Sequence, residues 1–147
     1  MRDSMRDEFS SDPIEQLRDW MTEAVESGQP EPSAMALASA DAEGRPSVRF
    51  LLLKEILSTG LLFATSYESR KARELETNPH AAAVLYWQPL HRQVRIEGRI
   101  ERATPEESDR IVPATMEFWI GRLDRLHDRF LYRRAADRTW TIERLSP

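Results

Sequence analysis

Two cations bracket a short apolar run in the first third of the chain, Arg49 before Phe50 and Lys54 after Leu53. In an extended strand these two cations lie on opposite faces, because successive side chains alternate between the faces. Cations of this kind can bind an anionic ligand. Taken alone, however, the pattern is more typical of two solvated charges at strand ends, which usually contribute little.

A second cluster combines hydroxyl groups and cations. Thr65 and Ser66 end an expected strand, and Arg70 and Lys71 open a helix expected from Ser69 to residue 77. Cations in a first turn oppose the helix dipole, which favours negative charge at that end. The arrangement makes sense where a phosphate docks, because N–H groups, hydroxyls and a guanidinium can converge on it. A solvent-facing helix start remains the alternative, and no glycine-rich loop indicates a nucleoside triphosphate site.

The third cluster lies near the C-terminus, between Trp119 and Phe130, where cationic side chains surround His127. A single histidine close to acids is most often structural or exposed. The histidines of the chain show no metal-ligand spacing. A Ser–His–Asp site stays open on spacing, although no nucleophile-elbow motif favours it.

The elements that must position these clusters are mostly short strands. One helix is expected to start at the cap Asp12, to carry an apolar stripe from Ile14 to Val25, and to end near Gly28. Strands are expected at 35–40, 47–53, 61–66, 81–87, 93–101, 115–120, 129–134 and 139–145. A second helix-start signature at residues 104–107 predicts a short helix that Pro113 ends.

Many short strands with few, short helices indicate a mainly β fold, a closed or nearly closed antiparallel barrel. The 147 residues fit one domain, expected over residues 12–147 after a flexible tail at 1–11. A net charge of −4 offers no basic surface for nucleic acid. The absence of cysteine excludes disulfides and thiolate sites. Without a membrane-length apolar run or a signal-peptide pattern, the expected location is the cytoplasm.

The clusters, in this order, resemble the pyridoxamine 5′-phosphate oxidase family, whose fold is an FMN-binding antiparallel split β-barrel. The stretches that carry the resemblance are DPIEQLRDWMTEA, RFLLLKE, LLFATSYESRKARELETNP, HRQVRIEGRIER and FWIGRLDRLHDRFLYRR. They cover most of the chain from Asp12 to Pro147, and the Ser-Arg-Lys-Ala and Arg-Leu-His-Asp-Arg-Phe motifs are specific to the family in combination.

The resemblance implies an FMN-dependent oxidase, a homodimer that converts pyridoxamine or pyridoxine 5′-phosphate to pyridoxal 5′-phosphate with oxygen as acceptor. It implies these FMN-binding residues: Arg49, Leu51, Leu52, Lys54, Ala64, Thr65, Arg70, Lys71, Gln93, and, from the partner subunit, Trp119 and Arg129. It implies that the substrate meets Lys54, Arg125, Leu126 and His127, with Arg125 and His127 catalytic and reaching across the dimer interface. No metal is implied.

The chain departs from the family pattern by a long internal segment that is missing between Ser108–Val112 and Pro113–Met116. In the family this segment carries a Tyr, an Arg and a Ser that clamp the substrate phosphate, and Ile111 stands where the Tyr is expected. Three alternatives therefore stay open: an FMN oxidoreductase with a different substrate, a non-catalytic module that binds FMN or pyridoxal phosphate, and an interaction domain without cofactor.

Overall fold

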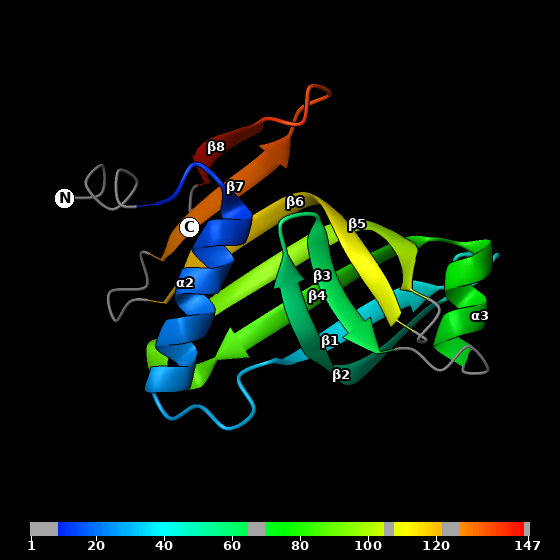
Figure 1. Cartoon of the computed structure of the whole chain (residues 1–147), viewed down its shortest axis with the longest axis horizontal. Coiled ribbons are helices and arrows are strands. Elements are labelled where there is room, and N and C mark those ends of the chain that lie inside the picture. Colours follow the sequence, from blue (N-terminus) through cyan, green and yellow to red (C-terminus); the bar gives the residue numbers. More distant parts are fainter. Residues whose placement is uncertain (1–8, 65–69, 105–107, 122–126, 146–147) are drawn as a thin grey trace.

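Over its described residues, the chain forms a six-stranded antiparallel barrel with a two-stranded extension and two α-helices (Figure 1). The computed structural model describes residues 9–64, 70–104, 108–121 and 127–145. The barrel strands are β1 (Ala34–Ala40), β2 (Pro46–Leu57), β3 (Gly60–Ala64), β4 (His80–Trp87), β5 (Arg92–Thr104) and β6 (Ser108–Ile120). Their order is β3-β2-β1-β4-β5-β6, and pairing of β3 with β6 closes the barrel. The mainly β fold expected from the sequence is thus confirmed.

Strand β6 belongs to both parts of the fold. Its first half pairs with β3 from Ser108 to Ile111, and its second half pairs with β7 (Asp128–Arg134) from Thr115 to Ile120. Strand β8 (Trp140–Leu145) then extends the sheet beyond β7. The barrel is therefore split at the middle of β6, where β3 and β7 diverge.

The split coincides with a bulge at which β5 and β6 approach closely. The register shifts between Glu97 and Gly98, and Gly98 faces Pro113. A Cβ atom on Gly98 would lie 2.1 Å from the carbonyl oxygen of Val112, so only glycine fits here without a backbone shift. Pro113 is tolerated inside β6 because a bulge does not require its missing N–H.

The short helix expected after Thr104 is wrong, because Ser108 begins β6 and Pro113 lies within that strand. The cap signature at residues 104–107 is local, whereas pairing with β5 and β3 buries Ser108, Asp109 and Ile111 in a sheet. Residues 105–107 themselves lie outside the described residues.

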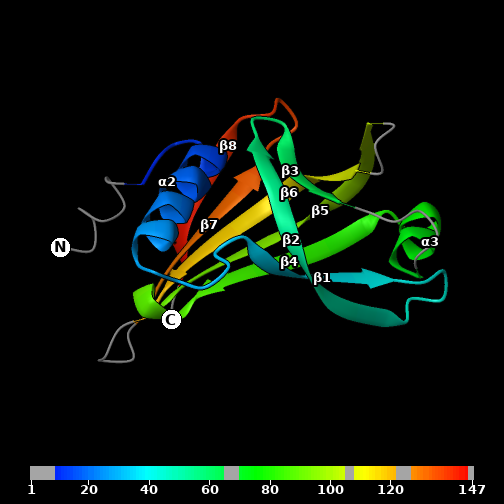
Figure 2. The ribbon, with the colours of Figure 1, turned by 60° about the horizontal axis from the view of Figure 1, so that its bottom comes forward.

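Helix α2 (Pro13–Glu26) covers one side of the extended sheet (Figure 2). Its buried face carries Leu17 and Trp20, and the Trp20 ring meets Phe118 edge-on with ring centroids 5.1 Å apart. Phe9 lies inside the segment for which we expected a tail, and its ring packs on the Phe130 ring with centroids 4.4 Å apart. None of the described helices is long and apolar enough to cross a membrane.

The N-cap of α2 offers a direct test of local stability. The Asp12 carboxylate accepts a hydrogen bond from the Ile14 N–H at 2.9 Å. Asp12→Ala is therefore expected to lower the free energy of unfolding by about 1 kcal/mol, as measured by urea denaturation. Asp19→Ala, on the exposed face of the same helix, is the control and should change it by less than about 0.5 kcal/mol. An equal loss in both variants would refute the capping role.

The remaining helix, α3 (Arg70–Thr77), lies at one end of the barrel, and the turn η1 (Gln88–Leu90) joins β4 to β5. The expected helix at 69–77 and the strands on either side of it agree with these bounds within a few residues. Helix α3 is the element that brings the second sequence cluster to the first.

Candidate functional site

The first candidate cluster lies where α3 meets the ends of β1 and β2. The side chains of Arg49 on β2 and Arg70 on α3 converge on the carboxylate of Glu74, which is only 5% exposed. Arg70 donates from Nε to Glu74 Oε1 at 2.9 Å, and Arg49 Nη2 lies 3.8 Å from Glu74 Oε2. The structure thus brings together two cations that lie 21 positions apart in the sequence.

Two serine hydroxyls complete this cluster and hold Arg49 in place. Arg49 donates to the Leu37 carbonyl and the Ser39 hydroxyl, both at 2.9 Å, and to the Ser47 hydroxyl at 2.6 Å. Ser39 and Ser47 in turn donate to Glu74 at 2.8–3.0 Å. Burial lowers the pKa of Arg49, an effect that the Glu74 carboxylate opposes. The guanidinium is therefore fixed before any ligand arrives.

The same contacts lower the pKa of the Glu74 carboxyl group. Its pKa lies below the ordinary 4.5, first because of the Ser39 hydrogen bond and then because of Ser47 and Arg70, although burial acts in the opposite direction. Because the pKa of Glu74 is lower in the folded protein than in the unfolded chain, its ionised carboxylate stabilises the fold at pH values above the ordinary pKa. This contribution is lost as the pH falls through the lowered pKa.

We therefore expect Glu74→Gln to flatten the acid side of the stability profile. The variant should be less stable than the parent at pH 7, and its melting temperature should fall less between about pH 5 and pH 3. Thermal unfolding across that range measures both effects. Glu26→Gln, an exposed change on α2, is the control and should keep the parent's slope. An unchanged slope for Glu74→Gln would show that this carboxylate does not control acid stability.

Other residues expected at this end lie around the cluster. Lys71 is in the first turn of α3, which contains no acidic residue, and Ala64 ends β3 beside Ser108. Leu51 and Leu52 are on β2 next to Arg49. Thr65 lies outside the described residues. The Lys54 ammonium donates to the hydroxyl of Ser108 at 3.0 Å, which links β2 to the start of β6.

The second candidate cluster forms a row across β5, β6 and β7. Gln93 is in register with Trp119, and Trp119 is in register with Arg129, so the three residues are neighbours on one face. The His127 ring lies against Trp119 with centroids 4.8 Å apart. Arg125 and Leu126 lie outside the described residues.

The two clusters lie at opposite ends of the molecule. Helix α3 is at one end of the long axis, and the end of β6 and the start of β7 are at the other (Figures 1 and 2). Within one chain, Arg70 and His127 therefore cannot contact the same small ligand.

Sequence reasoning missed two carboxylates that organise the clusters. Glu74 is one, and Glu117 is the other: it accepts from Arg129 Nε at 2.6 Å and from Arg95 Nη1 at 3.0 Å. Each is largely buried between two arginines. The position of Glu74 four residues after Arg70, on an expected helix, could have indicated its ion pair with Arg70 from the sequence. The cross-strand position of Glu117 is visible only in the folded sheet.

Apolar side chains are exposed on the outer face of β2. Phe50 is 81% exposed, Val48 67% and Leu52 51%, and all three alternate with the inward residues of the strand. Tyr86 on β4 is also half exposed. Contiguous exposed apolar side chains on a strand are typical of an interaction surface.

Comparison with known proteins gives consistent matches. The sequence profile of a family described as pyridoxamine 5′-phosphate oxidase matches residues 21–142. The pyridoxine/pyridoxamine 5′-phosphate oxidase of Burkholderia multivorans is 39% identical, with 92% of this chain and 89% of that protein aligned. The corresponding protein of Salinibacter ruber is 40% identical, with 97% and 92% aligned.

These alignments also reveal what this chain lacks. The alignment with the B. multivorans protein spans 191 positions, but 92% of the 147 residues is about 135, so about 55 positions of that relative lie opposite gaps. That relative therefore contains many positions without a counterpart here. In this chain, residues 108–120 form one continuous strand across the position at which we expected the family segment to be missing.

Solved structures resemble the fold closely. PhzG from Burkholderia lata, in complex with tetrahydrophenazine-1-carboxylic acid, matches with a TM-score of 0.87, 27% identity and 94% of both chains covered. A pyridoxamine 5′-phosphate oxidase-related, FMN-binding protein from Nostoc punctiforme matches with a TM-score of 0.77 at 18% identity, covering 88% of this chain and 96% of that one. The second likeness concerns the fold alone.

Proposed function

Because this chain belongs to the pyridoxamine 5′-phosphate oxidase family, we propose that it is an FMN-dependent oxidase acting on pyridoxamine or pyridoxine 5′-phosphate. The observation that carries the proposal is the convergence of Arg49 and Arg70 at one end of the barrel. Two guanidinium groups sharing one carboxylate leave a positive charge that suits a phosphate group.

The donors at this end fit the phosphate of FMN. Arg70 is 67% exposed and uses only its Nε toward the described residues, so its terminal amino groups can bind two phosphate oxygens. Lys71 adds a second cation in the same turn. Arg49, held by Leu37, Ser39 and Ser47, would act as the fixed member of the set. We also assign Thr65, Ala64 and the backbone of Leu51 and Leu52 to FMN.

The chemistry that FMN supplies when bound is acceptance of a hydride from the substrate carbon that becomes the aldehyde, with oxygen as the final acceptor. The protein binds and orients the substrate. Lys54 gives one of its three N–H donors to Ser108, which leaves two for an anionic substrate. His127, whose ring lies against Trp119, and Arg125 would face the substrate from the other side.

The two clusters make one site only when two copies of the chain meet. Their separation within a chain supports a homodimer in which Trp119, Arg125, His127 and Arg129 of one copy reach the FMN site of the other. The exposed face of Val48, Phe50 and Leu52 belongs to the strand that carries Arg49 and Lys54. We propose that this face packs against the second copy.

Phe50→Glu is accordingly expected to convert the dimer into a monomer, because it places a charge in an apolar interface. Sedimentation velocity measures the oligomeric state, and FMN binding should weaken in parallel. Val25→Glu is the control, since Val25 is equally an exposed apolar residue, at 60%, but lies on α2. A Phe50→Glu protein that remained dimeric would exclude this face as the interface.

The activity is tested with the FMN-loaded protein under anaerobic conditions. Loss of the oxidised flavin absorbance on adding pyridoxamine or pyridoxine 5′-phosphate, followed by peroxide release when oxygen is admitted, is the expected result. A bound flavin that neither vitamer bleaches would refute the oxidase proposal and leave a non-catalytic FMN-binding protein. A colourless protein that does not bind added FMN would refute the cofactor as well.

A second candidate substrate class is favoured by two observations. The closely similar PhzG structure holds a carboxylated ring compound without phosphate, and about 55 positions of the curated relative lie opposite gaps in this chain. An FMN oxidoreductase acting on an unphosphorylated ring carboxylate would need fewer phosphate-binding groups. Flavin bleaching by such compounds but not by the phosphorylated vitamers would select this alternative.

A further inference from the structure

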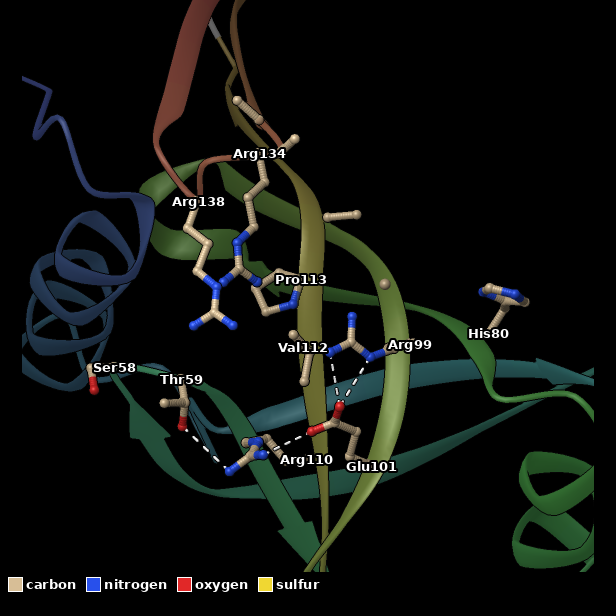
Figure 3. A pocket seen from close by; sticks show the side chains of 14 residues that line it. Ser58, Thr59, His80, Arg99, Glu101, Arg110, Val112, Pro113, Arg134 and Arg138 are labelled. Carbon is tan, nitrogen blue, oxygen red and sulfur yellow. Dashed lines mark hydrogen bonds and ion pairs between the residues drawn. The ribbon is translucent and has the colours of Figure 1, made fainter.

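A large cavity lies at the split of the barrel, away from both candidate clusters (Figure 3). Its volume is about 820 Å³, and its walls come from the β2–β3 turn, the start of β4, β5, β6, and the end of β7 with the turn that follows it. The cavity opens where β3 and β7 diverge along β6, next to Pro113. None of the described residues that we assign to FMN or substrate lines it.

The lining is rich in arginine and poor in acid. Arg99, Arg110, Arg134 and Arg138 line the cavity, and Glu101 is the one carboxylate among its described lining residues. Glu101 is already shared, because Arg99 binds it at 2.8 Å and Arg110 at 2.9 Å (Figure 3). Its pKa is lowered, first by the Arg110 hydrogen bond and then by that of Arg99, so it stays ionised. The balance of lining charges is strongly positive.

Arg134 and Arg138 have no carboxylate of their own among the described residues. Figure 3 shows both side chains reaching into the cavity, Arg134 from the end of β7 and Arg138 from the turn that follows it. The nearby acids are engaged elsewhere, since Asp137 accepts from Thr139, and Asp12, in an adjoining cavity, caps α2. Across the described part of the chain, every other arginine except Arg73 forms an ion pair with a carboxylate.

A buried donor adds a second, independent observation. The Nε of Arg110 is buried and has no hydrogen-bond partner among the described residues. Its neighbour Nη1 lies 3.5 Å from the hydroxyl of Thr59. This N–H is itself out of reach of a ligand, but its lack of an acceptor shows that donors outnumber acceptor atoms in this wall of the cavity.

We propose that this cavity binds the phosphate group of a small phosphorylated molecule. Arg134 and Arg138 would bind phosphate oxygens, because guanidinium groups match a dianionic phosphate. The cavity is far larger than one phosphate, and Val112, Pro113 and Ala136 provide an apolar wall for the rest of the ligand. This site is separate from the FMN phosphate cluster and does not depend on the proposed oxidase activity.

Isothermal titration of the full chain with inorganic pyrophosphate tests the proposal. Arg134→Gln combined with Arg138→Gln is expected to raise the Kd at least about tenfold, since charge-assisted bonds are lost. Arg133→Gln is the matched control, because Arg133 is the preceding residue of β7 but pairs with Glu143, and its Kd should stay within about twofold of the parent.

Ala136→Glu provides a second variant that adds a carboxylate to the cavity lining instead of removing a cation. It should abolish pyrophosphate binding while the melting temperature is maintained, because the new charge neutralises the arginines. The proposal is overturned if the parent binds no pyrophosphate, or if the double variant binds as tightly as the parent. It is also overturned if Arg133→Gln weakens pyrophosphate binding as much as the double variant does. The same holds if Arg49→Gln weakens pyrophosphate binding and the cavity variants do not.

Discussion

Arg70→Gln is expected to weaken FMN binding about 100-fold. Within the Arg49–Arg70–Glu74 cluster, Arg70 uses only its Nε toward the described residues. Its terminal amino groups can therefore donate to a ligand. Losing two charge-assisted hydrogen bonds of about 1.5 kcal/mol each corresponds to roughly two orders of magnitude in Kd. The substitution also leaves Glu74 less neutralised, and its charge would then repel the phosphate. Quenching of FMN fluorescence on titration with apoprotein measures the change.

Arg73→Gln is the control for this prediction. Arg73 lies on the same helix, is exposed and forms no ion pair with a described residue, so its removal takes away the same charge without a direct contact. We expect its Kd for FMN to change by less than about threefold. If Arg70→Gln weakens binding no more than Arg73→Gln, the phosphate is not bound at α3, and the assignment of this cluster fails.

Gly98→Ala is expected to cause a large loss of stability in the barrel. Its Cβ would stand 2.1 Å from the Val112 carbonyl oxygen and 2.9 Å from the Pro113 Cα, and both neighbours are backbone atoms that cannot rotate away. Forcing the strands apart should cost about 2–4 kcal/mol of unfolding free energy. This corresponds to a melting temperature lower by roughly 10 °C for a domain of this size.

Urea denaturation and thermal unfolding together measure this effect. Glu97→Ala is the neighbouring control, because Glu97 is exposed and forms no ion pair among described residues. Its stability should stay within about 0.5 kcal/mol of the parent. Equal stability of Gly98→Ala and Glu97→Ala would mean that the bulge can relax and that the close approach of β5 and β6 is not required.

The sequence predicted the elements that follow from local pattern. The alternation of Val94 and Ile96 with charged neighbours made β5 visible, and the Asp12 cap located the start of α2. The signature at residues 104–107 failed because it competes with long-range pairing of Ile111 to both Ile100 and Leu61. No local pattern reports a strand partner 50 residues away.

The candidate site was predictable in its cations but not in its acids. Arg49, Arg70 and Lys71 stand out because their positions relative to a strand end and a helix start are unusual. Glu74 and Glu117 resemble ordinary surface acids until the fold buries each between two arginines. The arginine-lined cavity is also invisible in the sequence, because its walls come from five separate segments.

The position of β6 in both parts of the fold affects how the protein unfolds. Since its first half closes the barrel on β3 and its second half supports β7, neither unit has a complete hydrogen-bonded edge without it. Detaching β6 would open the barrel and release the terminal hairpin in the same event. Loss of β6 would therefore couple the unfolding of the barrel to the unfolding of the terminal hairpin.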